Sequence, residues 1–360
     1  MVEIKTETLQ SMVNKASRGA SNNKLVPLTS YMGLTLSPNT FSILTTDGMN
    51  YLEVNTNLEG EPFRAVVLAD TFAKLVRKLT GDTVKMELTD RYLVVECDGT
   101  YNLELLLDDD GNAIEFHMPS EFDNLADKEK LGEFDRATIT RVMNSLKQSL
   151  AVTNDRPHYC CYRVGGEIIA TDTSIISVLN KKVFENARLI SAECLTLLDV
   201  ITDGATVAGA YKVGDSAVVY QSDFGVIFAR NPSGIENFNV SALRGFIDAE
   251  FPYHCKISTK ALLDTFERIE LFVGEYEAGA VSLKFDENGV TISSKSTSGV
   301  ELVEYEEVDA VPDYSCTLDV YSALTVFKAQ SSSVVDLYFG ADQTIKIVDG
   351  DLVTVVALMY

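Results

Sequence analysis

The sequence repeats one structural pattern six times along its length. Each copy consists of a residue suited to cap a helix, a short amphipathic helix, and two or three short strands joined by turns that contain Asp or Gly. The candidate caps are spaced 64, 65, 56, 67 and 61 residues apart, and they are Thr6, Asp70, Asp135, Ser191, Ser258 and Asp319. Their side-chain oxygens can accept hydrogen bonds from the free N–H groups of a first helical turn. Such a recurrence predicts a symmetric object rather than a fold organised around one active-site pocket.

Six segments carry apolar residues at the i, i+3, i+4, i+7 spacing of an amphipathic helix. These segments are 6–18, 69–79, 135–150, 191–201, 258–271 and 319–330. In the first of them, one face carries Leu9, Met12, Val13 and Ala16. Between the helices the apolar period changes to two, as in 84–105, and turn residues mark each reversal. The sequence therefore predicts an α+β fold in which helices pack on antiparallel sheets.

Three similar domains are expected from the length and from the repeat. A chain of 360 residues exceeds the size at which a single hydrophobic core stops growing. Two helix-and-strand units per domain give the predicted domains 1–128, 129–252 and 253–360. The first boundary lies where acidic residues and Asn interrupt the pattern, and the second lies beside the Phe251-Pro252 pair.

The distribution of charge is more informative than its total. The chain has 30 basic and 53 acidic residues, and its net charge of −23 argues, taken alone, against a protein that binds nucleic acid. The windows 5–18, 69–79 and 135–150, which cover the first three helical segments, nevertheless hold nine basic residues against three acidic ones. The nine are Lys5, Lys15, Arg18, Lys74, Arg77, Lys78, Arg136, Arg141 and Lys147. Segregation of this kind creates an attractive path for a polyanion on an otherwise repulsive protein.

A plainer interpretation of these basic residues stays open. Lys and Arg commonly cover the solvent-exposed face of a helix without binding anything. The basic trend also weakens along the chain, because the fourth helical segment has no Lys or Arg and the fifth is acidic on balance.

The sequence offers no convincing catalytic or metal site, so we expect a protein that is not an enzyme and needs no cofactor or metal. Its three histidines, His117, His158 and His254, do not form an HxH or HExxH pattern. The GxSxG, GxxxxGK[ST] and GxGxxG motifs are absent. The acidic run 108–112 resembles a calcium loop, but it departs from the EF-hand pattern and reads as a hairpin turn.

Other features point to a reducing cytoplasm. The six cysteines include no CxxC pair, and the adjacent pair Cys160-Cys161 reads as part of a core strand. No apolar run approaches the roughly 18 residues of a membrane span, and the first residues do not read as a signal peptide. The apolar segment 352–360 is either a closing sheet strand or one wall of a binding groove.

Short segments along the whole chain resemble, in order and spacing, the bacterial DNA polymerase III beta subunit, the sliding clamp. These segments are Leu25-Val-Pro-Leu with Gly33-Leu-Thr-Leu, Leu44-Thr-Thr-Asp-Gly, Val67-Leu-Ala-Asp-Thr-Phe, Ser120-Glu-Phe-Asp-Asn-Leu, Thr153-Asn-Asp-Arg-Pro-His-Tyr, Ile169-Ala-Thr-Asp, Glu250-Phe-Pro-Tyr and Val355-Val356. The resemblance implies a DNA-clamp fold with three domains. It also implies a homodimer that closes head to tail into a ring around double-stranded DNA, with twelve helices lining the hole.

The resemblance also implies site residues. Contacts to duplex DNA, without base readout, would be made by Lys24, Lys74, Arg77, Lys78, Arg141, Lys147, Asn154, His158 and Tyr159. The dimer interface would bring Tyr101 and Leu103 of one protomer against Leu271 and Phe272 of the other. A hydrophobic groove for peptides of the replicative polymerase, the clamp loader and other partners would be lined by Cys160, Thr171, Thr173, Ser174, Ile175, Ile176, Pro252, Asp319, Ser322, Val356, Leu358 and Met359.

The chain departs from the family pattern at two places in this groove. Thr173, Ser174 and Ile175 stand where the family usually has Gly, His and Arg. The chain ends in Ala-Leu-Met-Tyr rather than the usual Pro-Met-Arg-Leu. The groove therefore loses two basic positions, as expected for a divergent bacterial or a phage-encoded member. The alternatives are a clamp-like peptide-binding scaffold that does not encircle DNA, and a hydrolase, for which no catalytic constellation is found.

Overall fold

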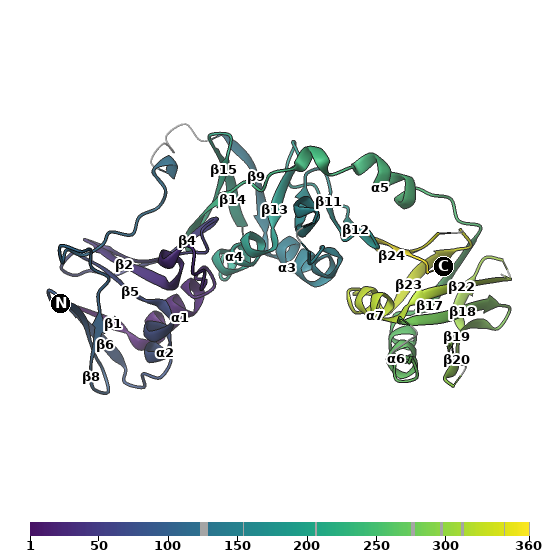
Figure 1. Ribbon diagram of the computed structural model, residues 1–360, viewed down its shortest axis with the longest axis horizontal. Helices are drawn as coiled ribbons and strands as arrows, with labels where there is room; N and C mark the ends of the chain where they lie inside the picture. The colour runs from purple at the N-terminus through teal and green to yellow at the C-terminus, as the bar shows by residue number, and fades with distance from the viewer. Residues whose placement is uncertain are drawn as a thin grey trace. The chain divides into compact units, whose positions relative to one another are not determined.

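The computed structural model describes residues 1–122, 129–153, 155–205, 207–274, 278–295, 298–310, 313–341 and 343–359. The chain divides into two compact units. Unit 1 comprises Met1–Ile139 and Glu193–Asn231, and unit 2 comprises Thr140–Ala192 and Pro232–Tyr360. Each unit combines helices with antiparallel sheets, so the predicted α+β class is confirmed (Figure 1).

The six-fold repeat is a strand that runs directly into a helix, followed by three further strands. The first two copies are β1 (Val2–Lys5), α1 (Thr6–Ala16), β2 (Tyr31–Ser37), β3 (Thr40–Thr46) and β4 (Asn50–Asn57), then β5 (Phe63–Leu68), α2 (Ala69–Val76), β6 (Thr83–Leu88), β7 (Tyr92–Glu96) and β8 (Thr100–Glu104). The next two are β9 (Lys130–Asp135), α3 (Arg136–Ser145), β10 (Cys161–Val164), β11 (Ile168–Thr171) and β12 (Ile175–Leu179), then β13 (Arg188–Ser191), α4 (Ala192–Thr202), β14 (Val207–Val213), β15 (Ala217–Ser222) and β16 (Gly225–Arg230). The last two are β17 (Tyr253–Ser258), α6 (Thr259–Glu270), β18 (Ala280–Asp286), β19 (Gly289–Ser294) and β20 (Val300–Val303), then β22 (Tyr314–Asp319), α7 (Val320–Lys328), β23 (Val334–Phe339), β24 (Thr344–Asp349) and β25 (Leu352–Ala357).

The strand in front of each helix explains which predicted caps are right. Asp135, Ser258 and Asp319 each end a strand and accept a hydrogen bond from a backbone N–H in the first turn of the helix that follows. The prediction is wrong for Thr6 and Asp70, which already lie inside α1 and α2. The cap positions of those two helices are the strand ends Lys5 and Leu68, whose extended backbone turns into the helix without a side-chain cap.

The copies interlock in pairs because each lends its first strand to its neighbour. β1 pairs with β6 of the second copy, and β5 pairs with β2 of the first. The same exchange links β9 with β14 and β13 with β10, and then β17 with β23 and β22 with β18. The three interlocked pairs follow the order of the three predicted domains. The boundaries near 128 and 252 stay a prediction, and residue 128 lies outside the described residues.

Two further ladders join the pairs into long sheets. β4 pairs antiparallel with β16, which gives the eight-stranded sheet β5-β2-β3-β4-β16-β15-β14-β9 of unit 1. β12 pairs antiparallel with β25, which gives the nine-stranded sheet β13-β10-β11-β12-β25-β24-β23-β17-β21 of unit 2. The ninth strand, β21 (Tyr305–Val308), is an addition to the repeat. The apolar segment at the end of the chain thus contains a sheet strand, β25, with a partner on each side. Of the two alternatives predicted for this segment, this agrees with the sheet strand.

Helices fill the space between sheets in each unit. In unit 1, α1 and α2 pack on each other and contact both the four-stranded sheet β1-β6-β7-β8 and the eight-stranded sheet. In unit 2, α6 and α7 pack on each other between the four-stranded sheet β20-β19-β18-β22 and the nine-stranded sheet. The apolar faces predicted for these helices are buried, as at Leu9, Phe72, Phe266 and Phe327.

The described part of the chain contains one further α-helix that was not predicted, α5 (Val240–Ile247). It buries only Leu243 and Ile247, so its apolar stripe is too short to stand out in the sequence. Asn239 caps it by accepting a hydrogen bond from the N–H of Ala242 at 3.0 Å. The acidic run 108–112 is a turn, as predicted, closed by a 2.8 Å bond from Asp108 N–H to the carbonyl of Asn112.

Candidate functional site

The basic side chains predicted to meet DNA in unit 1 are exposed. Lys74 lies on α2, and Arg77 and Lys78 follow its last turn. Lys74 Nζ lies 2.7 Å from Asp70 Oδ2, and Arg77 Nε donates to Asn14 Oδ1 at 2.8 Å. An exposed i,i+4 ion pair contributes only about 0.3–0.5 kcal/mol, so a phosphate can replace its carboxylate. The remaining candidate, in the loop after α1, is Lys24, which is also exposed.

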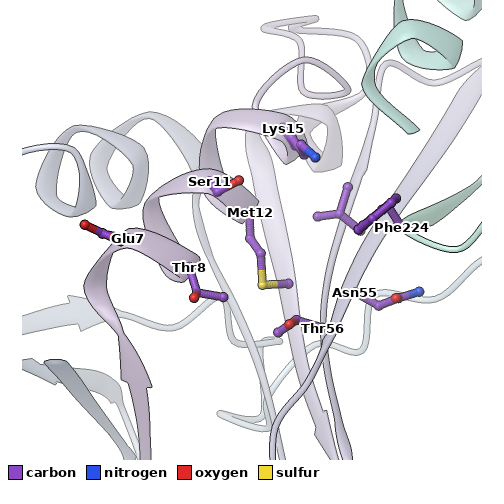
Figure 2. Close-up of a pocket in the computed structure, with 9 residues that line it drawn as sticks. Glu7, Thr8, Ser11, Met12, Lys15, Asn55, Thr56 and Phe224 are labelled. Atoms are coloured by element: carbon purple, nitrogen blue, oxygen red, sulfur yellow. The ribbon is translucent and has the colours of Figure 1, made fainter. Parts of the chain in front are cut away.

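A pocket of about 330 Å³ lies beside α1 (Figure 2). One of its lining residues, Lys15, is a basic residue that forms an ion pair within the protein. The pocket walls come from α1, from β4 and from Phe224 in the turn between β15 and β16. Lys15 Nζ lies 3.4 Å from Asp203 Oδ2 and 5.3 Å from the centre of the Phe224 ring. The hydrogen bond from Arg136, together with the charge of Lys15, lowers the pKa of Asp203 below its ordinary value. Lys15 and Arg136 therefore serve to hold unit 1 together.

Arg141 has a structural partner that the sequence did not indicate. Its side chain is only 22% exposed, and its Nη2 lies 3.3 Å from Asp349 Oδ2. Asp349 is buried and also accepts hydrogen bonds from Ser331 and Ser332. Burial alone would raise the pKa of Asp349, but these hydrogen bonds and the one from Arg141 outweigh it and lower the pKa to about 2. Arg141 thus compensates a buried carboxylate and presents little free charge.

The remaining DNA candidates lie around the short 3₁₀ helices after α3. Lys147 is exposed in the helix Lys147–Ser149, and His158 is half-buried in the helix Pro157–Cys160. Tyr159 is buried, and its ring packs edge-on against Phe238 with 5.3 Å between ring centres. Asn154 lies outside the described residues. Tyr159 therefore supports the position of His158 rather than offering a side chain to solvent.

The apolar residues predicted to line the peptide groove divide between the two faces of the nine-stranded sheet. Ile175, Val356 and Leu358 belong to the core that α6 and α7 cover. Ile176 belongs to the core on the other face, with Val355 and the helix α5. Successive side chains of a strand point to opposite faces, so neighbours in sequence cannot line one groove together. The apolar candidates Ile175 and Ile176 therefore belong to two different cores, and the predicted groove stays a prediction.

The polar groove candidates mostly form turns and caps. Thr173 has a φ of 82°, in a region that favours glycine. Asp172 holds this turn by accepting bonds from the N–H groups of Ser174 and Ile175. Asp319 is likewise engaged, because its Oδ2 accepts from both N–H and Oγ–H of Ser322.

The other members of the set are placed as follows. Thr171 is buried, and its Oγ1 accepts a bond from the N–H of Thr173 at 3.0 Å. Pro252 is exposed, and Cys160 and Met359 are partly buried. The Met359 N–H donates to the carbonyl of Thr317 at 2.9 Å, and Cys160 Sγ donates to the carbonyl of Thr153 at 3.2 Å.

The predicted dimer contacts lie at two sheet edges that carry exposed apolar side chains. In unit 1, β8 is the outer strand of its sheet, with Tyr101 36% exposed and Leu103 buried. In unit 2, Leu271 and Phe272 follow α6 and are 79% and 48% exposed. Beside them β20 is the outer strand of its sheet.

Sequence reasoning missed two apolar residues on β20. Val300 and Leu302 are 55% and 49% exposed on this strand. Their spacing of two is visible in the sequence and gave a usable signal, but only the sheet order shows that the strand has a free edge.

Within the described ranges, no helix is long and apolar enough to cross a membrane. A scan of protein-family models and a search of curated proteins find no match to the sequence.

Comparison with solved structures finds bacterial clamps of the same fold. A DNA polymerase sliding clamp from Bacillus subtilis matches with a TM-score of 0.85 at 17% identity, covering 99% of this chain and 98% of that one. The beta subunit from DNA polymerase of Streptococcus pyogenes gives 0.84 at 14% identity and 99% coverage of both chains. DNA polymerase III subunit beta from Borrelia burgdorferi gives 0.85 at 13% identity, covering 100% of this chain and 99% of that one. The predicted DNA-clamp fold is therefore confirmed, and the low identities fit a divergent sequence.

Proposed function

We propose that this chain is a DNA sliding clamp. In this role it is a processivity factor without catalytic activity that closes as a head-to-tail homodimer around duplex DNA. It would tether the replicative polymerase, the clamp loader and other proteins that carry a clamp-binding motif. The observation that carries the proposal is a pair of free sheet edges at equivalent places of a six-fold repeat, in the fold of the bacterial clamps.

The pairing rule of the repeat supports closure of the ring. The last strand of the first copy pairs with that of the fourth, as β4 with β16. The last strand of the third copy pairs with that of the sixth, as β12 with β25. The last strands of the second and fifth copies, β8 and β20, have no such partner in the described structure, and each lies at the end of a sheet. Pairing β8 of one protomer with β20 of another would complete the pattern, and doing so at both ends closes a ring of two chains.

The exposed apolar side chains at these edges support the same contact. Tyr101 near one edge, and Val300, Leu302, Leu271 and Phe272 near the other, are large and more than a third exposed. Apolar side chains gathered at unpaired edge strands are a liability unless another chain covers them. We expect β8 and β20 to form an antiparallel ladder with these side chains beside it, as β4 and β16 do.

The exposed basic residues support contact with DNA through phosphate alone. Lys24, Lys74, Arg77, Lys78 and Lys147 are exposed, and His158 is half-buried. We keep these residues as the proposed contacts, with Asn154, and assign Arg141 and Tyr159 supporting roles. Lys and Arg side chains that meet phosphates release counterions and read no sequence, which suits a ring that must slide. The acidic remainder of the protein would repel DNA from other surfaces.

Partner peptides would bind on the face of the nine-stranded sheet beside α5. Ile176 and Val355 lie on this face with Leu243 and Ile247 of α5. These four side chains are less than 10% exposed and form a core, so the apolar side chains of an extended peptide would meet the residues at the margin of this core. The exposed residues Thr173, Ser174 and Pro252 would lie at its rim, together with Met359.

Retention on circular and linear DNA tests the proposal. The protein is incubated at high concentration with a nicked circular plasmid, and unbound protein is removed by gel filtration at about 0.3 M salt, where simple electrostatic binding is screened. Half of the complex is then cut once with a restriction enzyme. A clamp stays on the circle and leaves the cut plasmid. Equal loss from both, or a monomer at micromolar concentration, contradicts the proposal and leaves the peptide-binding scaffold as the alternative.

A further inference from the structure

His254 on β17 lies between two carboxylates from neighbouring strands of the nine-stranded sheet. Its Nδ1 lies 2.7 Å from Asp309 Oδ2, and its Nε2 lies 2.9 Å from Asp336 Oδ1. Asp309 directly follows the edge strand β21, and Asp336 lies on β23, on the other side of β17. The ring therefore joins the edge strand to the strand behind β17. All three residues belong to unit 2, so the inference does not rest on the proposed function.

This arrangement fits the protonated form of the ring. An ionised carboxylate only accepts hydrogen bonds, and a neutral imidazole has one N–H to donate, whereas an imidazolium has two. The ring also stacks on Tyr338 with 4.5 Å between ring centres, and the face of an aromatic ring attracts a cation. Burial lowers the pKa of His254, but the hydrogen bonds and charges of Asp309 and Asp336 outweigh it and raise the pKa above its ordinary value.

The other charged groups nearby cannot take over from the ring. The titratable groups around His254 are Lys256 on its own strand, Glu307 and Asp309 from β21, Asp336 and Tyr338 from β23, and, beside Tyr338, Lys346 from β24. Lys256 Nζ lies 2.5 Å from Glu307 Oε2, and Lys346 Nζ donates to backbone carbonyls. A neutral ring would therefore leave the two aspartates facing each other without a bonded cation in the described structure.

The end of β21 beside His254 is the more weakly held of its two ends. At the far end, Tyr305 packs against the core and its Oη donates to the carbonyl of Gly289 at 2.8 Å. At the near end, Val308 packs partly buried on the core, and the Asp309 N–H donates to the carbonyl of His254 at 3.3 Å, which is long for such a bond. The near end can therefore open while Tyr305 keeps the strand on the sheet.

We propose that His254 is a pH-sensitive latch on this edge of the sheet. As an imidazolium it holds the Asp309 end of β21 against β17, and as a neutral imidazole it releases that end. Because the pKa of the ring is raised on folding, the latch contributes stability that is complete below the unfolded value of about 6.5 and is lost as the pH rises through the folded value. Release frees the carbonyl of His254 at the sheet edge.

NMR of protein labelled with ¹³C-histidine follows the ring from about pH 5 to pH 9. The chain has three histidines, so the signal that is lost in His254→Gln identifies the latch. This ring should titrate above about 6.5, and Asp309→Asn, which removes one of the two charges, should move its titration back toward that value. A ring that titrates at or below about 6.5 in the unchanged protein would overturn the proposal.

Hydrogen exchange at the Asp309 amide measures the release itself. Its protection factor, which corrects for the pH dependence of intrinsic exchange, should fall as the ring loses its proton. The fall should reach up to about ten-fold for every pH unit by which the measured pKa exceeds 6.5, because folding and protonation are linked. Amides of the β17–β23 ladder in the same sample should keep their protection.

The variants separate a latch from a fixed ion triad. His254→Gln and Asp309→Asn should each remove most of the pH dependence, whereas His117→Gln, the matched control in unit 1, should keep it. Asp309 is 64% exposed, so Asp309→Asn carries both measurements if His254→Gln does not fold. Protection that stays constant through the titration of the ring indicates a fixed triad and contradicts the latch. Equal loss along the β17–β23 ladder indicates general unfolding and contradicts it too.

Discussion

Two kinds of sheet edge occupy the same place in the repeat. The last strands of four copies are paired, as β4 with β16 and β12 with β25. The last strands of the other two, β8 and β20, are not paired in the described structure. All five residues of β12 are buried, whereas four of the five in β8 are exposed. The repeat thus offers six equivalent edges and covers four of them within one chain.

The paired and the free edges carry similar apolar side chains, but those side chains differ in how far they are buried. At the β4–β16 ladder, Leu52 faces Ile227, and both are fully buried. At the free edges, Val300 and Leu302 are as apolar but about half exposed. The free edges carry apolar side chains like those of a paired ladder but have no strand to cover them, so we interpret them as the protomer interface of the proposed clamp.

Truncation inside a paired edge should have the largest effect on folding. Leu52→Ala leaves a cavity between β4 and β16 and should lower the free energy of unfolding by about 2–5 kcal/mol. Urea denaturation measures this loss. The solution mass of the folded protein should not change, and a dimer-to-monomer shift would show that the two kinds of edge are not independent.

Truncation at a free edge should weaken the dimer and leave the stability of the protomer nearly unchanged. Leu271→Ala together with Phe272→Ala should weaken the dimer by roughly 2–4 kcal/mol, about 30- to 1,000-fold in Kd. Light scattering at low micromolar concentration should then give half the original mass, with thermal unfolding of the protomer nearly unchanged. Leu25→Ala removes an apolar side chain that is 91% exposed and lies in the loop after α1, and it serves as the control. An unchanged mass of the double variant would exclude this edge from the interface.

The contribution of Asp349, on the strand next to a paired edge, to the free energy of unfolding should depend on pH. Asp349 lies on β24, beside β25, and its pKa is lowered to about 2. A lowered pKa contributes stability that is complete above the unfolded value of about 3.9 and is lost as the pH falls toward 2. Asp349→Asn should therefore cost about 2 kcal/mol at pH 7 and almost nothing near pH 2. Urea denaturation at both pH values checks this, and a cost that does not vary with pH would contradict it.

The smallest effect is expected from removing basic side chains that lie on neither kind of edge, and it concerns DNA affinity. Lys74→Ala with Lys78→Ala removes two exposed charges near α2. The slope of log affinity for duplex DNA against log salt should fall by about 2, with mass and stability unchanged. Fluorescence anisotropy over a salt series measures the slope. A slope that stays the same would mean that these side chains only cover a helix face.

The sequence predicted the repeat and its helices because their signals are local. The apolar spacing around Leu9 or Phe266 lies within one helix, so six helices were predicted where they occur. The start of a helix was less certain where a strand leads straight into it, as at Lys5 and Leu68. The exchange of first strands between copies could not be predicted, because pairing partners lie dozens of residues apart.

The site residues were predicted less well because they depend on register and on distant partners. Ile175 and Ile176 are equally apolar, and only the sheet shows which face each takes. Arg141 looked like a free charge, yet its partner Asp349 lies 208 residues away. The exposed Val300 and Leu302 became candidates only once the order of strands showed β20 to be an edge.

Covalent closure of the two free edges tests the central claim most directly. Asn102→Cys on β8 and Val300→Cys on β20 place exposed thiols on the two edges, and a bismaleimide can join them between protomers on a nicked circular plasmid. The unchanged chain, with its own six cysteines, receives the same reagent as control. We predict a cross-linked ring that stays on the circle in detergent and leaves once the plasmid is cut. Cross-linked protein that leaves the intact circle, or the absence of any link between protomers, would contradict the closed clamp.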